Sequence, residues 1–288
     1  MKFSARVIAG DQIAQKFGVP TANLDVSNLS VPEKTGVFAA EVKIDDHKYE
    51  GILFIGQKHF PRTVFIAELF IFDFTGDLYD KVVEVETQKF FRSPQKFKNS
   101  EELFRAIKND IQKAKKFFLR RAVFAKWENV PLVEKDDMAK KAVEQLSQNT
   151  DFNEAKNVLI FAPISKEISF VDKLILEFPQ KKYYFPRIVG AELQFFESEF
   201  SSLVKDKLGI LTPLETSLVF ENQKNTIAIV PAVAADGNGN RLGRGGGFYD
   251  RFLTNFSGKK IVVLPEFAVF DSVPIEAHDV MVDLVLKV

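Results

Sequence analysis

The chain has 288 residues, of which 46% are hydrophobic and 27% are charged, an ordinary globular composition with material for about two domains. Its 39 basic and 39 acidic residues give a formal net charge of zero, which provides no charge excess for nucleic acid or an anionic membrane as a partner. The sequence contains no cysteine, so disulfides, thiolate metal sites and cysteine nucleophiles are excluded. Without a signal-like segment or an apolar run near the roughly 18 residues of a membrane span, the pattern predicts a cytoplasmic protein.

Short apolar segments without an intervening helix occupy the first part of the chain. Alternating or wholly apolar segments predict strands at Val37–Ile44, Tyr49–Ile55, Thr63–Phe74 and Lys81–Val85. Turn-forming residues such as Asp45-Asp46 separate them. Successive strands of this kind predict a small antiparallel β-barrel or sandwich.

The hydrophobic period changes at Ser100. Ser100 is a typical helix N-cap, and the two glutamates after it suit the first turn of a helix. Apolar residues then recur at helical spacing at Leu103, Ile107, Ile111 and Ala114. Because no glycine or proline follows before Pro131, we expect a helix to join two domains, 1–115 and 116–288.

The second part of the chain alternates between strands and helices. The pattern predicts strands at Asn157–Ala162, Lys182–Pro186, Thr226–Val230 and Lys260–Leu264, with helices at Phe170–Phe178 and from about Phe248. This alternation predicts an α/β domain of three layers with a mostly parallel sheet.

A glycine-rich string runs from Asp236 to Arg251, between an apolar strand and a helix. Its glycines allow backbone N–H groups to approach phosphate oxygens, and Arg241 and Arg244 offer charge to neutralise them. Asp250 offers a carboxylate to a magnesium ion that bridges phosphates. The spacing matches neither a P-loop nor the dinucleotide-binding fingerprint. The alternative is a surface loop whose arginines are merely solvated.

The whole string closely resembles the signature of 5-formyltetrahydrofolate cyclo-ligases, and further matches follow in that family's order over residues 115–288. The resemblance implies that ATP is bound by Lys116, Arg120, Arg241, Gly243, Arg244, Gly245, Gly246, Gly247 and Tyr249. It implies a folate site at Glu167, Arg187 and Phe248, and magnesium ligands at Asp250 and Asp279, with Arg244 as a catalytic residue. Thr212 stands where many members have glutamate.

The reaction implied by this resemblance is the ATP-dependent closure of 5-formyltetrahydrofolate to 5,10-methenyltetrahydrofolate. The formyl oxygen attacks the γ-phosphate, N10 of the folate adds to the activated carbon, and phosphate leaves. Such chemistry needs charge neutralisation and alignment more than a strong base.

A second informative string, Gly18-Val-Pro-Thr21-Ala-Asn23-Leu24, lies near the N-terminus. It brings the Thr21 hydroxyl and the Asn23 amide close together as hard oxygen ligands, which suit a magnesium nucleotide. The alternative is a proline turn with a side-chain cap. Further along, Glu68 is a carboxylate within an apolar strand, where burial would raise its pKa as a general base requires. A solvent-facing glutamate on an edge strand is the alternative here.

Together these features resemble riboflavin kinase over residues 3–116. The resemblance implies that Glu68 deprotonates the riboflavin 5′-hydroxyl, and that Thr21 and Asn23 bind magnesium and the ATP phosphates. The stretch Gly10–Lys16 departs from the family, because it lacks the later glycines and the arginine of the usual loop. The adenylyltransferase segment that often precedes this kinase is not in the sequence, so FAD synthesis is not expected.

The sequence therefore predicts a bifunctional enzyme that uses ATP and Mg²⁺ with two small-molecule substrates, 5-formyltetrahydrofolate and riboflavin. The alternative is an active folate cyclo-ligase whose N-terminal barrel binds a flavin or a nucleotide without turnover.

Overall fold

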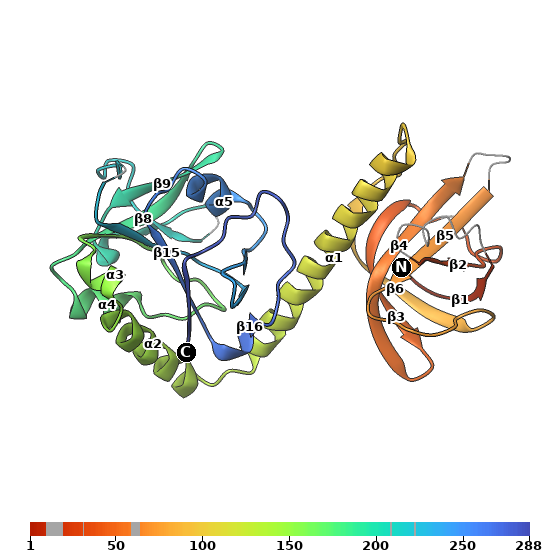
Figure 1. The fold of residues 1–288 in the computed structure, drawn as a ribbon, viewed down its shortest axis with the longest axis horizontal. Helices are drawn as coiled ribbons and strands as arrows, with labels where there is room; N and C mark the ends of the chain where they lie inside the picture. Colours follow the sequence, from red (N-terminus) through yellow and green to blue (C-terminus); the bar gives the residue numbers. More distant parts are fainter. Residues whose placement is uncertain (10–19, 31, 59–63, 208, 222) are drawn as a thin grey trace. The chain divides into compact units, whose positions relative to one another are not determined.

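The computed structural model describes residues 1–9, 20–30, 32–58, 64–207, 209–221 and 223–288 (Figure 1). The chain divides into two compact units, Met1–Phe118 and Leu119–Val288. This division falls within helix α1 (Ser100–Glu128), three residues after the boundary that the sequence suggested. No helix in the described part of the chain is both long and apolar enough to cross a membrane.

The first unit is a closed antiparallel barrel, as predicted. Its neighbouring strands follow the order β1-β2-β5-β4-β3-β6, and β6 pairs with β1 to close it. The strands are β1 (Lys2–Ile8), β2 (Ala22–Leu24), β3 (Gly36–Ile44), β4 (His47–Lys58), β5 (Val64–Ile71) and β6 (Val82–Arg92). Strand β6 continues seven residues beyond the predicted Lys81–Val85. Two register shifts against β3 disturb the alternation that sequence analysis relies on.

The barrel has an inner core and an apolar patch on its outer face. Alternate residues of each strand point inward, as in β1, where Phe3, Ala5 and Val7 are buried between exposed neighbours. On the outer face, Ile52 and Phe72 pack with apolar residues of α1. Helix α1 thus completes this unit by covering one side of the barrel.

The start of α1 is capped one residue earlier than predicted. The side chain of Asn99, rather than Ser100, accepts a hydrogen bond from the backbone N–H of Glu102 at 2.9 Å. The Glu102 carboxylate in turn accepts one from the backbone N–H of Lys98 at 3.0 Å. This reciprocal pair satisfies the N–H of Glu102, a donor that a helix start leaves without a partner, and the N–H of Lys98 just before the cap.

The second unit is an α/β domain with a mostly parallel sheet, again as predicted. Its six-stranded sheet has the order β17-β15-β12-β7-β8-β9, in which all neighbours are parallel except β8 and β9. The strands are β7 (Asn157–Leu159), β8 (Lys182–Val189), β9 (Glu192–Glu197), β12 (Thr226–Ile229), β15 (Lys259–Leu264) and β17 (Leu284–Lys287). The antiparallel strand β9 was not predicted. It follows β8 through a tight turn at Gly190, whose φ of 62° is in the left-handed region.

Helices cover this sheet. Helix α2 packs against α3, α4 and β17, while α5 packs against β9. In Figure 1, α2 and α4 lie below the sheet and α5 lies above it, which gives three layers. The helices are α2 (Leu132–Ser147), α3 (Thr150–Glu154), α4 (Val171–Glu177) and α5 (Phe248–Leu253), with 3₁₀ turns η2 (Phe200–Ser202) and η3 (Glu266–Ala268).

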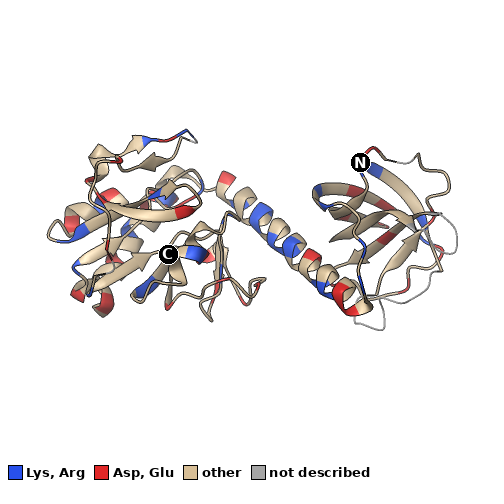
Figure 2. Cartoon of the chain, turned by 90° about the horizontal axis from the view of Figure 1, so that it is seen from above, with Lys and Arg blue, Asp and Glu red and all other residues tan. Residues whose placement is uncertain are grey.

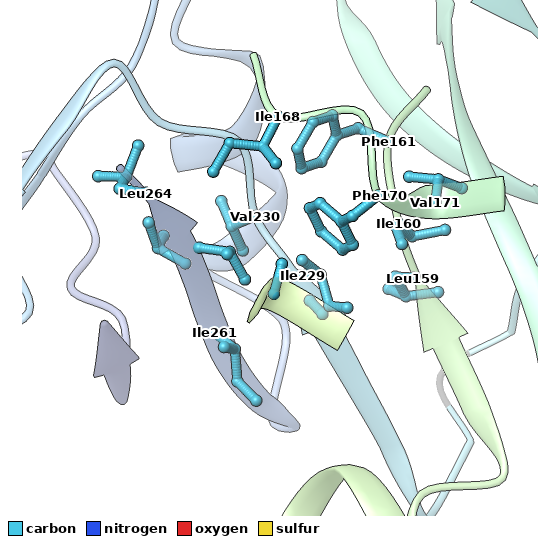
Figure 3. Packing of buried hydrophobic residues seen from close by; sticks show 14 of the residues in the cluster. Leu159, Ile160, Phe161, Ile168, Phe170, Val171, Ile229, Val230, Ile261 and Leu264 are labelled. Carbon is cyan, nitrogen blue, oxygen red and sulfur yellow. The ribbon is translucent and has the colours of Figure 1, made fainter. Parts of the chain in front are cut away.

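The core of this unit lies around the central strands. Ile160, Ile229 and Ile261 come from three neighbouring segments of this unit, and the ring of Phe170 lies near Ile160 and Ile229 (Figure 3). Strands β7 and β12 are buried along their whole length, and after their first residues, Asn157 and Thr226, they are apolar. The segment that follows β7 carries Glu167, and the segment that follows β12 leads to the glycine-rich string.

Two small sheets complete the unit. A two-stranded sheet pairs β10 (Val204–Lys205) with β11 (Leu211–Thr212). A three-stranded sheet has the order β14-β13-β16 and consists of β13 (Ala234–Asp236), β14 (Arg241–Leu242) and β16 (Val269–Phe270). The glycine-rich string begins on this second small sheet.

Candidate active sites

Asp236 shapes the turn between β13 and β14. Its Oδ1 accepts hydrogen bonds from the backbone N–H groups of Asn238 and Asn240 at 3.0 and 3.1 Å. Its Oδ2 accepts one from the backbone N–H of Val273 at 3.1 Å. Burial disfavours the charged form of Asp236, but these bonds and the Asn240 side chain outweigh it and lower the pKa. Asp236 therefore holds the turn, which presents Arg241 to the site.

Arg241 on β14 is buried and pairs with Asp250 in the first turn of α5. Nη2 of Arg241 lies 2.7 Å from Oδ1 of Asp250. The same oxygen accepts a hydrogen bond from the backbone N–H of Val280 at 3.3 Å. Burial lowers the pKa of Arg241, while the charges of Asp250 and Asp279 oppose this. Among the described residues, the buried Nε of Arg241 has no hydrogen-bond partner.

Arg244 and Glu167 are brought together although 77 residues separate them. Nε of Arg244 lies 3.0 Å from Oε1 of Glu167, and Nη2 donates to the Ser165 carbonyl at 3.0 Å. Burial raises the pKa of Glu167, against the backbone N–H of Ile164 and the charge of Arg244. The residue predicted to bind phosphate and the residue predicted to bind folate thus share one contact.

Helix α1 contributes Arg120 to the glycine-rich loop. Nε of Arg120 donates to the carbonyl oxygen of Gly243 at 2.7 Å. Gly245 adopts a φ of 101°, and a Cβ built there would lie 3.6 Å from Nη2 of Arg120. Burial lowers the pKa of Arg120, opposed by the charges of Asp279 and Glu276. Arg120 therefore supports the loop, and the φ of Gly245 favours glycine at that position rather than a residue with a side chain.

Lys116 lies one turn before Arg120 on α1 and is buried, with only 6% of its surface exposed. Figure 2 shows other basic residues spaced along the same helix. Lys116 belongs to the first compact unit and Arg120 to the second.

The end of the loop leads into α5. Gly247, with a φ of 67°, precedes the helix, and a Cβ at Gly246 would press against the ring of Phe248. The Phe248 ring lies 4.8 Å from the guanidinium of Arg251. The predicted helix is present but has only six residues, so it adds little dipole to the loop.

The Tyr249 side chain presents a buried hydroxyl to this region. Its ring contacts Phe195 edge to face, with centroids 6.2 Å apart. The hydroxyl has no hydrogen-bond partner among the described residues. Burial raises the pKa of Tyr249, and the nearby charge of Glu167 adds to this. A buried hydroxyl without a hydrogen-bond partner costs free energy of folding, and such a group is often found where a ligand binds.

The predicted magnesium ligands flank Arg241. Asp250 and Asp279 both lie close enough to that arginine for their charges to raise its pKa. Asp279 also forms a cluster with Glu276 and His278, whose possible ligand atoms lie within 4.8 Å of one another. Sequence analysis missed Glu276, because a single exposed-looking glutamate in a loop carries no local signal.

Arg187 lies within β8, two residues before its end, and contacts a different segment. Its Nη1 donates to the carbonyl of Pro213, and its Nη2 pairs with Glu215, both at 2.6 Å. Thr212 donates its hydroxyl to the Pro186 carbonyl at 3.2 Å. These contacts join β8 to β11. Within the described part of the chain, the hydrogen bonds of Arg187 are thus made with this segment and not with the glycine-rich loop.

In the barrel, the structure brings Asn23 and Glu68 together. Asn23 on β2 lies directly opposite Glu68 on β5, while Thr21 immediately precedes β2. Their neighbours Leu24 and Ala67 face the inner core, so Asn23 and Glu68 project from the outer face. Glu68 is half-buried, and β5 pairs with strands on both sides, which removes the edge-strand alternative. The altered loop Gly10–Lys16 lies outside the described residues.

Comparisons with known proteins divide the chain in the same way. Residues 1–118 match the riboflavin kinase family, and residues 112–288 match the 5-formyltetrahydrofolate cyclo-ligase family. The solved 5,10-methenyltetrahydrofolate synthetase of Aquifex aeolicus is 29% identical, with a TM-score of 0.55 over 60% of this chain and 89% of that chain.

Two curated relatives each match about two fifths of the chain. The "Trifunctional protein RibF/MnmA" of Mycoplasmoides gallisepticum is 37% identical over 113 residues, 39% of this chain and 17% of that protein. A "Bifunctional riboflavin kinase/FMN adenylyltransferase" of Bacillus subtilis is 33% identical over 117 residues, 39% of this chain and 37% of that protein. The match thus spans well under half the length of either relative.

Proposed function

We propose that the second unit catalyses the ATP-dependent cyclisation of 5-formyltetrahydrofolate to 5,10-methenyltetrahydrofolate, since the chain belongs to the 5-formyltetrahydrofolate cyclo-ligase family. The observation that carries this proposal is the convergence of Arg120, Arg241 and Arg244 on one glycine-rich loop. Three guanidinium groups around glycine backbone N–H donors suit a polyphosphate.

In the proposed reaction, the formyl oxygen attacks the γ-phosphorus of ATP, and ADP departs. N10 of the folate then adds to the activated formyl carbon and loses its proton, and phosphate leaves with the former formyl oxygen. Both steps move negative charge among phosphate oxygens, so preorganised cations contribute more than an acid or a base. Asp250 and Asp279 are hard oxygen donors of the kind that Mg²⁺ prefers, and the ion would neutralise further phosphate charge.

The test is the formation of methenyltetrahydrofolate, followed by its absorbance, with the purified chain, 5-formyltetrahydrofolate and Mg-ATP. Arg244→Ala is expected to lower turnover at least about 100-fold, as expected for a lost transition-state donor. The matched control is Lys182→Ala, which removes a cation from an exposed ion pair with Glu197 on the same sheet. A wild-type chain that folds but does not cyclise the substrate contradicts the proposal.

For the barrel we infer a second activity, the transfer of the γ-phosphoryl group of ATP to the 5′-hydroxyl of riboflavin. The strand register supports this activity, because it sets Asn23, a predicted ligand of Mg-ATP, opposite Glu68, the predicted base. In this proposal Glu68 takes the proton of the hydroxyl, whose oxygen attacks the γ-phosphorus while ADP departs. Thr21 and Asn23 hold the Mg-ATP phosphates.

FMN formation from riboflavin and Mg-ATP tests this second activity. Glu68→Gln is expected to abolish it, whereas Glu86→Gln is expected to leave it unchanged, because the Glu86 side chain forms an exposed ion pair with Lys2 on the same barrel. Folate cyclisation by the same preparation is the internal control for a folded chain. If the folate reaction runs and no FMN forms, the alternative of a binding barrel without turnover replaces this proposal, and a flavin titration follows.

A further inference from the structure

Phe124 on α1 lies between two cations of the second unit. Its ring centroid is 5.3 Å from the guanidinium carbon of Arg244 and 5.3 Å from Nζ of Lys166. The residue follows Arg120 by one helical turn and packs half-buried against the main core. The aromatic face therefore offers both cations an electrostatic contact from a fixed element.

Among the described residues, the hydrogen bonds of Arg244 hold one edge of its guanidinium. Nε pairs with Glu167, and Nη2 donates to the Ser165 carbonyl, so the loop before α4 holds that edge. The Phe124 ring adds a contact from a different element. The Nη1 edge takes no part in these contacts. Three contacts from two elements orient the plane of the group and leave one pair of N–H donors for a ligand.

The loop that carries two of these contacts is itself attached to α1. Lys166 has a φ of 67°, an uncommon conformation for a residue other than glycine. This turn lies between Ser165 and Glu167, both of which contact Arg244. Nζ of Lys166 lies 2.8 Å from Oε1 of Glu128, one turn beyond Phe124. Phe124 thus lies where the helix, the loop and Arg244 meet.

We propose that Phe124 is a positioning residue for Arg244, whose guanidinium it holds with the Nη1 edge available to the phosphates of ATP. The inference rests on the proposed function of the glycine-rich loop. Phe124 touches no reacting atom and acts through Arg244 alone. The aromatic face, rather than apolar volume, is the property that matters.

The experiment compares Phe124→Leu, which keeps apolar volume, with Phe124→Tyr, which keeps the aromatic face. Phe124→Leu is expected to raise the KM for Mg-ATP by about three- to tenfold, the range of a partly desolvated cation–π contact. The KM for 5-formyltetrahydrofolate changes little, and Phe124→Tyr restores the wild-type value. The matched control is Phe267→Leu, which removes a ring from beneath Lys126 in the same unit and is expected to leave both KM values unchanged.

A double-mutant cycle separates positioning from general packing. In an Arg244→Ala background, Phe124→Leu is expected to cause no further loss of Mg-ADP affinity, measured by titration calorimetry. An equal loss in both backgrounds overturns the inference, as does a failure of Phe124→Tyr to restore the KM. If Phe124→Leu does not fold, Phe124→Met makes the same comparison.

The nucleotide titration also keeps this inference distinct from the proposed function. A wild-type chain that binds Mg-ADP without cyclising folate contradicts the proposed reaction, yet its titration with the Phe124 variants still tests the positioning. Unchanged Mg-ADP affinity in Phe124→Leu overturns the positioning even where the wild-type chain turns over.

Discussion

Nη2 of Arg241 lies 2.7 Å from Oδ1 of Asp250, across the glycine-rich loop that separates the two residues by nine positions. The Arg241 side chain is 2% exposed and that of Asp250 is 17% exposed, so the pair is largely withdrawn from water. A buried ion pair adds little net stability, but removal of one partner leaves a charge without compensation. The pair therefore closes the loop and commits one carboxylate oxygen of the predicted magnesium site.

Asp250→Ala is expected to lower the free energy of unfolding by about 3 kcal/mol, because it leaves the Arg241 guanidinium buried without its carboxylate. Chemical denaturation of the full chain, followed through the second unit, measures the loss. Asp271→Ala, an exposed aspartate of the same unit, is the control and is expected to change little. The double variant Arg241→Met/Asp250→Leu is expected to recover most of the stability and none of the folate activity. Full stability in Asp250→Ala contradicts the role given to the pair.

Tyr249→Phe is expected to stabilise the ligand-free chain while it weakens substrate binding. The buried hydroxyl has no hydrogen-bond partner among the described residues, so its removal relieves a desolvation cost of about 1 kcal/mol. Tyr183→Phe is the matched control, because the Tyr183 hydroxyl donates to the Phe178 carbonyl at 3.0 Å. That variant is expected to lose stability. Thermal unfolding of both variants, with and without Mg-ATP and folate, measures the change in stability and the change in ligand binding. A loss of stability in Tyr249→Phe without ligand refutes the prediction.

The raised pKa of Glu167 predicts a particular pH dependence of stability. Burial raises this pKa above the usual value of about 4.3, so the folded state binds the proton more tightly than the unfolded state. The stability that protonated Glu167 contributes is fully present below the pKa of Glu167 in the unfolded chain. It is lost as the pH rises through the pKa of Glu167 in the folded chain. Glu167→Gln is expected to flatten this part of the profile of unfolding temperature against pH.

Arg244→Ala extends the same test. Arg244 opposes the rise in the pKa of Glu167, so its removal is expected to move the loss of stability to higher pH. Glu199→Gln changes an exposed glutamate of the same unit and serves as the control. Identical profiles for the wild-type chain and Glu167→Gln are the outcome that contradicts the assignment.

The barrel unit depends on a second buried pair. Nε and Nη2 of Arg92 on β6 both donate to Oδ2 of Asp110 on α1, at 2.9 and 2.7 Å. Asp110→Ala is expected to destabilise this unit by about 3 kcal/mol, since Arg92 then lacks its carboxylate. Glu84→Ala, which breaks an exposed pair with Lys43, is expected to cost under about 1 kcal/mol. Hydrogen exchange in β6 and in residues 100–118 of the full chain measures both effects, and equal exchange in the two variants argues against the pair.

Local chemistry in the sequence accounted for much of the fold. Predominantly apolar segments predicted β7 and β12, and the glycine-rich string predicted the loop between β14 and α5. The predictions failed where pairing rather than local pattern decides. Strand β6 is longer than predicted and has register shifts against β3, β9 pairs with β8 after a glycine turn, and Asn99 instead of Ser100 caps α1.

The sequence by itself determined the division into a barrel and an α/β unit, because hydrophobic period and turn chemistry are local properties of the chain. It also determined which residues carry charge in the two candidate sites. Only the tertiary structure decided which of them meet. Strand register sets Asn23 opposite Glu68, and the packing of three distant segments brings Arg244 to Glu167 and Phe124. Such contacts join residues far apart in the chain, so they depend on the closed barrel and the packed core, which no short stretch of sequence encodes.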